Sequence, residues 1–140
     1  MISKGHSHIE KTVVLNDWPS INGFIKIGDN SFIMDYCVLH GHGGITIGND
    51  VLIGPHTMIV AGSHIFENPN VLIRLQGEIY KGIVIEDDVW IGAHCSILDG
   101  VVIGEGSVIG ANSLVNKSIP PYSVAYGNPC KIIRKRGSRL

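Results

Sequence analysis

Seven histidines are the side chains of this sequence best suited to chemistry near neutral pH. Five of them fall in the middle of the chain, at His40, His42, His56, His64 and His94. An imidazole titrates near ~6.5, so it can take a proton from a hydroxyl nucleophile. The same ring is a common zinc ligand. The residue types alone therefore leave general base catalysis and metal binding open.

The three cysteines are spaced too widely for a cysteine-based site. Cys37, Cys95 and Cys130 form no C-x-x-C pair, and their number is odd. This pattern favours reduced thiols in a cytoplasmic protein over a disulfide framework or a zinc ribbon.

The charge balance and the apolar runs exclude further classes. Eleven Lys and Arg against twelve Asp and Glu give a net charge of −1, which argues against a nucleic-acid binder with a broad basic face. No apolar run approaches the ~20 residues that cross a bilayer, and the first residues lack the apolar stretch of a signal peptide. We expect no nucleic-acid partner and no membrane insertion.

The composition indicates that strands position these side chains. The 140 residues include 22 Ile and 13 Val but only 4 Ala and 8 Leu. Ile and Val fit pleated surfaces, whereas Ala and Leu are the better helix formers. A helical bundle and a doubly wound α/β fold are therefore excluded. The 18 glycines need a separate explanation.

An aliphatic residue recurs at every sixth position in three runs. Glycine follows many members of these runs, as in Ile27-Gly28 and Ile91-Gly92. A period of six matches neither a helix nor simple strand alternation; it predicts a short strand plus a turn, repeated. The sixteen positions are Ile21, Ile27, Ile33, Leu39 and Ile45; Ile47, Ile53, Ile59 and Ile65; and Ile79, Ile85, Ile91, Ile97, Ile103, Ile109 and Val115.

The period predicts a prism of stacked coils. Each hexapeptide forms one side, the aliphatic residue points inward, and glycine or another small residue stands where the backbone turns a corner. We expect the repeat to cover residues 21–119, with a two-residue phase shift at 41–44 and a loop insertion at 66–82. Interruptions of a repeat emerge as loops, and loops often carry function.

The two ends of the chain lack the period. Residues 1–20 are expected to cap the open end of the repeat. Pro120-Pro121 ends it, and Asn128-Pro129 is typical of a helix start, so the tail, residues 120–140, is expected to hold a short basic helix over 129–136. Its cations, Lys131, Arg134, Lys135 and Arg136, would lie near the helix C-terminus.

The C-terminal half resembles the hexapeptide-repeat transferases. The resemblance rests on residues 85–93 (IEDDVWIGA), 97–104 (ILDGVVIG), 108–117 (VIGANSLVNK) and 127–131 (GNPCK). It is contiguous from about Ile45 to Arg136, and the run closely resembles maltose and galactoside O-acetyltransferases and sugar acetyltransferases of surface-polysaccharide clusters. It implies an all-β fold, a left-handed parallel β-helix, in a homotrimer with its active sites between subunits.

The resemblance also singles out His64 among the seven histidines. Residues 45–64 align with the galactoside acetyltransferase pattern without a gap, which places His64 at that family's catalytic base. The implied reaction moves an acetyl group from acetyl-CoA to a sugar hydroxyl, in surface polysaccharide or lipopolysaccharide biosynthesis. Deprotonation by His64 would make the hydroxyl a better nucleophile, and backbone N–H groups would bind the oxyanion.

The same resemblance assigns residues to the two substrates. For acetyl-CoA, Ala93 and Ala111 match backbone positions along the pantetheine arm. Positions near the adenosine phosphates match Asn116, Lys117, Lys131 and Arg134. The sugar positions of the family align with Met34 and His42, which differ from the usual Asn and Asp. Asp35, one residue away, and His42 are the tentative acceptor residues.

Three alternatives accompany this interpretation. A sugar amine could be the acceptor, giving N-acetylation, because an ammonium group must also lose a proton. A metalloenzyme similar to γ-type carbonic anhydrase would use several of the histidines, but the sequence lacks that family's pair of ligands five residues apart, so we expect no metal. An inactive scaffold subunit would bind no CoA.

Overall fold

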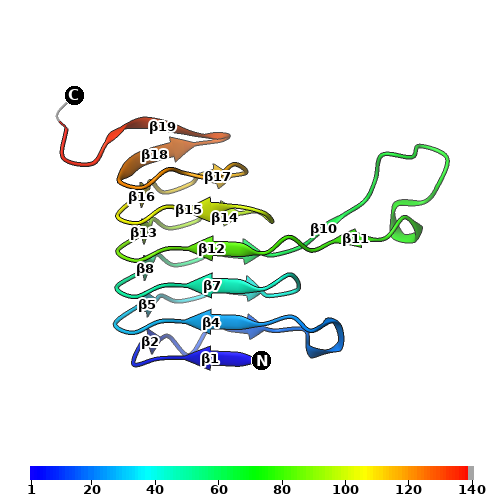
Figure 1. Ribbon diagram of the computed structural model, residues 1–140, viewed down its shortest axis with the longest axis horizontal. Helices are drawn as coiled ribbons and strands as arrows, with labels where there is room; N and C mark the ends of the chain where they lie inside the picture. Colours follow the sequence, from blue (N-terminus) through cyan, green and yellow to red (C-terminus); the bar gives the residue numbers. More distant parts are fainter. Residues whose placement is uncertain (139–140) are drawn as a thin grey trace.

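The computed structural model describes residues 1–138, which form a stack of coils with the N-terminus at one end and a C-terminal hairpin at the other (Figure 1). Parallel strands of successive coils pair edge to edge. Within the described residues they form three sheets, one on each side of the prism. This is the prism of stacked coils that the period predicts, and its parallel strands make it the β-helix that the resemblance implies.

Each sheet takes one strand from most coils. Sheet A contains β1 (Ile2–Lys4), β4 (Ile25–Ile27), β7 (Ile45–Ile47), β12 (Ile83–Ile85) and β15 (Val102–Ile103). Sheet B contains β2 (His8–Ile9), β5 (Phe32–Ile33), β8 (Leu52–Ile53), β13 (Trp90–Ile91), β16 (Val108–Ile109), β18 (Ser123–Gly127) and β19 (Cys130–Lys135). Sheet C contains β3 (Val14–Asn16), β6 (Val38–His40), β9 (Met58–Val60), β14 (Ser96–Ile97) and β17 (Leu114–Val115).

The predicted aliphatic positions form the core. Thirteen of the sixteen are buried, and they stack in register, as Ile53, Ile91 and Ile109 do on sheet B. The prediction of an inward side chain is wrong for the other three positions. Ile21 and Ile79 are 37% and 41% exposed, and Ile65 is half-buried. Each stands at the end of a run, where the chain leaves the coil.

Glycine supplies the left-handed backbone angles at one corner, between sheets C and A, where Gly44, Gly82 and Gly100 have φ of 92°, 91° and 84°. Positive φ angles occur at Asn30, Asp50 and Asp88 on one corner and at His56 and His94 on another. The glycines that follow the inward residues allow neighbouring coils to approach each other closely. A Cβ on Gly54 would lie 2.6 Å from the backbone nitrogen of Ala93. The glycine excess therefore has two causes, which are close contact between coils and the turn at the corner between sheets C and A.

Residues 1–20, expected to cap the repeat, form a coil at that end. The strands β1, β2 and β3 pair in parallel with β4, β5 and β6. Lys4 occupies the register position that Ile27 occupies one coil later. This exposed lysine gives the end of the stack a polar position. The segment between β3 and β4 contains a short 3-10 helix, η1 (Pro19–Ile21).

A long arm leaves the stack after sheet C of the third coil and returns at β12 (Figure 1). Its base is an antiparallel pair, β10 (Ser63–His64) and β11 (Glu78–Ile79), and its outer part holds a 3-10 helix, η2 (Ile73–Leu75). The arm includes the expected insertion at 66–82. The carboxylate of Asp99 accepts backbone N–H bonds from Lys81 and Gly82 at 2.9 and 2.8 Å, which anchors the returning chain.

The predicted C-terminal helix over 129–136 is wrong. Residues of this segment form β19, which pairs antiparallel with β18. Because β18 extends sheet B from β16, its other edge would lack partners without β19, and the β-branched Ile132 and Ile133 suit a strand. Arg136, expected in the solvated helix end, donates to Asp88 Oδ2 at 2.8 Å. Along residues 1–138, no helix has the length and apolar character to cross a membrane.

Candidate active site

Two neighbouring pockets share a wall that carries His64. The small pocket has a volume of about 230 Å³ and the long pocket about 460 Å³. Both are lined by Val60, Gly62, Ser63 and His64. The small pocket adds His40, His42, Glu78 and Tyr80. The long pocket adds Ile65, Phe66, Glu67, Ile79, Lys81, Leu98, Asp99 and Asn116.

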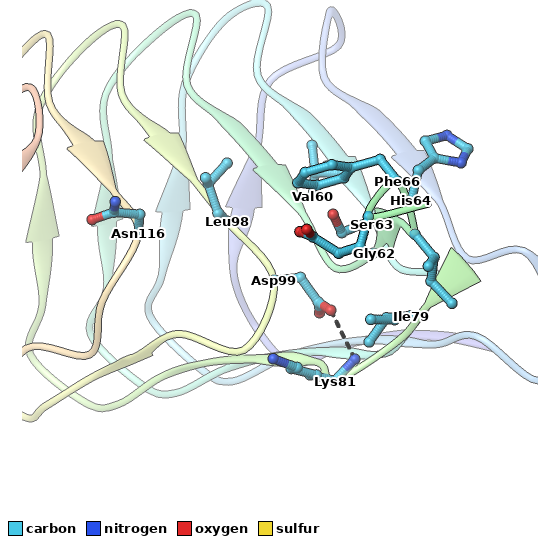
Figure 2. Close-up of a pocket in the computed structure, with 12 residues that line it drawn as sticks. Val60, Gly62, Ser63, His64, Phe66, Ile79, Lys81, Leu98, Asp99 and Asn116 are labelled. Carbon is cyan, nitrogen blue, oxygen red and sulfur yellow. Dashed lines mark hydrogen bonds between the residues drawn. The ribbon is translucent and has the colours of Figure 1, made fainter. Parts of the chain in front are cut away.

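A single column of residues on the edge of sheet C supports both pockets. His40 pairs with Val60, and Leu98 and Asn116 follow the paired strands β14 and β17 on the next two coils. Figure 2 shows Val60, Leu98 and Asn116 in this order along the coils, with His64 beyond Val60. The arm leaves the stack between the coil of His40 and the coil of Leu98. His64 therefore lies beside the column at the point where the arm leaves it, and lines both pockets.

The base of the arm orients the imidazole of His64. His64 and Glu78 are direct partners in the antiparallel pair, and His64 Nδ1 lies 3.5 Å from Glu78 Oε1. The Tyr80 hydroxyl donates to the other oxygen of Glu78. A carboxylate beside Nδ1 favours a proton on that nitrogen, which leaves Nε2 as the unprotonated one. The His64 side chain is 62% exposed, so its imidazole is open to solvent at the pockets.

Aromatic rings enclose His42 in the small pocket. The His42 ring stacks on Trp18 at 4.2 Å between centroids and is parallel to Tyr80 at 5.9 Å. Among residues 1–138, neither His42 Nδ1 nor Trp18 Nε1 has a hydrogen-bond partner, although both atoms are buried. Burial lowers the pKa of His42, and the neighbouring His40 lowers it further. His42 is therefore neutral at physiological pH.

The far end of the long pocket adjoins a third pocket of about 320 Å³ that bears two lysines. Asn116 lines both of these pockets. Lys117 and Lys131 line the third one, together with Ser118, Ile119, Pro129, Cys130 and Ile132. A continuous lining thus runs from His64 past Asn116 to two cationic side chains.

The sequence-predicted site residues fall into two groups in space. His64, His42, Asn116, Lys117 and Lys131 lie along the pockets at the edge of sheet C that follows its strands. The others lie elsewhere in the described chain. Ala93, Ala111 and Asp35 occupy the corner between sheets B and C, and Arg134 Nη1 on β19 donates to the carbonyl oxygens of Lys135 and Ser138.

Sequence reasoning missed Trp18, Glu78, Tyr80 and Asp99. Glu78 and Tyr80 lie in the arm, where no period relates them to His64. Trp18 lies in an irregular segment, and Asp99 has the appearance of an ordinary turn residue. Coil stacking brings Asp99 to the long pocket and Trp18 onto His42, whereas the arm brings Glu78 and Tyr80 to the small pocket by folding back on itself. Within residues 1–138, no three His, Cys, Asp or Glu side chains gather as a metal-binding cluster.

Comparison with known proteins places this chain in a family. Residues 82–117 match the family described as "Bacterial transferase hexapeptide (six repeats)". A hexapeptide-repeat acetyltransferase from Vibrio cholerae O1 biovar eltor, solved in complex with acetyl coenzyme A, is 39% identical, with a TM-score of 0.74 over 97% of this chain and 69% of that one. The chain belongs to the hexapeptide-repeat transferases.

Two further relatives of this transferase have named sugar specificities. A maltose O-acetyltransferase from Clostridium difficile 630 is 32% identical, with a TM-score of 0.84 over 96% of this chain and 69% of that one. The galactoside O-acetyltransferase of Escherichia coli K12 is 40% identical over 116 residues, which are 82% of this chain and 56% of that protein. The chain thus spans little more than half the length of this curated relative.

Proposed function

We propose that this hexapeptide-repeat transferase moves an acetyl group from acetyl-CoA to a sugar hydroxyl, with His64 as the general base. One observation carries the proposal: His64 stands between two pockets on one column of sheet C. The small pocket would hold the sugar, and the long pocket would hold the thioester end of acetyl-CoA. The two substrates would then meet at Nε2 of His64.

The proposed reaction is a direct transfer. Nε2 of His64 takes the proton of the sugar hydroxyl while its oxygen attacks the thioester carbonyl carbon. The carbon–sulfur bond then breaks, and the imidazolium returns the proton to the CoA sulfur. Glu78, 3.5 Å from Nδ1, stabilises the imidazolium while it exists. Cys37 and Cys95 are buried and are not needed as nucleophiles.

The long pocket and the lysine-bearing pocket support the placement of acetyl-CoA. Asn116 joins them, so a pantetheine arm extending from His64 would pass Leu98 and Asn116. Lys117 and Lys131 would then meet the phosphates at the other end. The two exposed cations suit a polyanionic group, and their lysine side chains act as point charges.

The remaining predicted residues support a site shared between copies of the chain. Ala93, Ala111 and Asp35 lie at a different corner from His64, and Arg134 is apart from both. A homotrimer would bring that corner of one copy to the pockets of the next, with Ala93 and Ala111 along the pantetheine arm. Arg134 would add a cation for the phosphates of the cofactor.

The biological setting forms part of the proposal. The resemblance of residues 73–77 and 81–85 to polysaccharide-cluster enzymes favours acetylation of a surface polysaccharide or lipopolysaccharide precursor. The three free cysteines suit the reducing cytoplasm. The named galactoside and maltose relatives favour a hydroxyl acceptor over an amine.

The test is a thiol-release assay with acetyl-CoA over a panel of hexoses, amino sugars and nucleotide sugars. We expect release with a hydroxyl acceptor, and His64→Ala should lower kcat by ~10²–10⁴. His8→Ala is the matched control, because His8 also lies beside a glutamate, Glu10, but in the first coil. Retention of most activity by His64→Ala would refute the role of His64. Release only with amino sugars would establish the N-acetyl alternative.

A further inference from the structure

Trp18 has a backbone conformation that is uncommon for a large aromatic residue. Its φ of 47° lies in the left-handed region, immediately before η1. Such a conformation is costly for a residue with a bulky Cβ substituent and persists where surrounding contacts demand it. Here it places the indole ring on His42, with the edge of His40 6.2 Å away between centroids. The strained residue thus forms the support behind the small pocket.

The contacts of His42 determine which of its nitrogens carries the proton. Nδ1 is buried and has no hydrogen-bond partner within residues 1–138. An acceptor without a partner is tolerated more readily than a buried N–H without one, so the proton belongs on Nε2. Because His42 lines the small pocket, Nε2–H is the group that it can offer to a ligand.

The charges around the small pocket define what it can bind. None of the described side chains that line it is Lys or Arg, whereas Glu78 is a carboxylate. The titratable groups facing His42 are His40 from β6, His64 from β10, and Glu78 and Tyr80 from the returning part of the arm. A carboxylate or phosphate on a ligand would meet Glu78 without a countercharge. The exposed ring of Tyr80 instead suits the C–H face of an uncharged sugar.

We propose that Trp18 is a positioning residue that holds His42 as a neutral Nε2–H donor, so that the small pocket selects an uncharged saccharide through one of its oxygen lone pairs. The selectivity for a saccharide rests on the proposed acetyl transfer. The Trp18–His42 relationship does not, and it can be measured without either substrate.

A single-tryptophan protein tests the Trp18–His42 relationship. The chain has two tryptophans, and Trp90 is 54% exposed on the outer face of sheet B, so Trp90→Phe leaves Trp18 as the only emitter. A protonated imidazole quenches a stacked indole. We expect no quenching step near pH ~6.5, where an ordinary histidine titrates, and a step at lower pH that His42→Gln removes. A step at or above pH ~6.5, or one that survives His42→Gln, would overturn the proposal.

Kinetics test the positioning role. Trp18→Ala should raise the KM for the sugar about ten-fold, as expected for about 1.4 kcal/mol of lost binding, and leave the KM for acetyl-CoA unchanged. Trp18→Phe keeps a stacking ring and should restore most of the loss. Equal changes in both KM values, or no rescue by Phe, would assign Trp18 a merely structural role and overturn the proposal.

Selectivity is tested with matched sugar probes. The C6 carboxamide and the C6 carboxylate of methyl galactoside have nearly the same shape but differ in charge, and Trp18 emission in the Trp90→Phe protein reports binding of each without acetyl-CoA. We expect the neutral probe to bind more tightly by ten-fold or more. Equal or preferred binding of the carboxylate, or binding of neither probe, would overturn the selectivity. If the wild type shows no acetyl transfer but the fluorescence results are as expected, only the proposed function is refuted.

Discussion

His64 and Glu78 are direct partners across the base of the arm, with Nδ1 of the imidazole 3.5 Å from the Glu78 carboxylate. Thirteen residues of chain lie between them, including η2. Gln76 closes the outer part of the arm, because its Nε2 donates to the carbonyls of Asn68 and Val71 at 2.9 and 2.7 Å. The arm therefore presents His64 and Glu78 together on a defined support.

Removing the charge of Glu78 should slow the reaction. Glu78→Gln keeps the side-chain shape but no longer stabilises the imidazolium, so kcat should fall by about 10- to 100-fold with little change in either KM. Steady-state kinetics of thiol release measure this. Glu10→Gln, which alters the carboxylate beside His8, is the matched control and should leave kcat unchanged. An unchanged kcat in Glu78→Gln would show that the carboxylate has no catalytic effect.

Substitution of Lys117 or Lys131, the two lysines of the third pocket, should change the KM for acetyl-CoA but not the KM for the sugar. Lys117→Gln or Lys131→Gln should raise the KM for acetyl-CoA about two- to five-fold, because exposed charge contacts contribute little each. The effect should shrink in 0.5 M salt, which screens such charges. Lys26→Gln, on sheet A, is the control. A rise in the sugar KM instead would place the lysines on the other substrate.

Close packing of coils makes Gly92 intolerant of a side chain. A Cβ there would lie 2.7 Å from the backbone nitrogen of Ala111, so Gly92→Ala should lower the free energy of unfolding by about 1–3 kcal/mol. At Gly62 the nearest atoms belong to the side chains of Tyr80 and His42, at 3.2 and 3.3 Å, and Gly62→Ala should cost less than about 1 kcal/mol. Urea unfolding compares the two; equal losses would contradict the close approach as the cause.

The lowered pKa of His42 makes folding sensitive to acid. Above pH ~6.5, His42 is neutral in both states and adds no pH dependence. As the pH falls through ~6.5, the unfolded chain binds a proton that the folded chain does not, so the free energy of unfolding decreases until the lower folded pKa is reached.

The comparison of His42→Gln with the wild type measures this contribution. Urea unfolding at pH 7.5 and pH 5.5 should show a smaller acid loss in His42→Gln, because glutamine does not titrate. His6→Gln is the control, since the His6 side chain is 99% exposed. The same acid loss in the wild type and in His42→Gln would rule out His42 as a source of the acid sensitivity.

The sequence alone determined the stack and its core. A period of six in aliphatic residues has one economical arrangement, in which every sixth residue points inward, and Ile53, Ile91 and Ile109 confirm it. The period also located its own interruptions, and thus the arm that begins beside His64. These features follow from local pattern because each coil repeats the environment of the one before it.

The tertiary structure decided the conformation of the segments that lie outside the repeat or at its ends. Ile21 and Ile79 match the period but lie outside the core, because the chain leaves the coil there. The segment 129–136 has a helix-start signal, yet the open edge of β18 draws it into a strand. Local preference is weak where a neighbouring strand edge needs hydrogen-bond partners.

The residues around the two pockets were also decided by the tertiary structure. Trp18 reaches His42 because two successive coils stack, and Glu78 reaches His64 because the arm folds back on itself. The paths of such irregular segments depend on their own internal contacts, not on a repeated pattern. The sequence could therefore single out His64 as the candidate base, whereas only the folded chain shows which residues surround it.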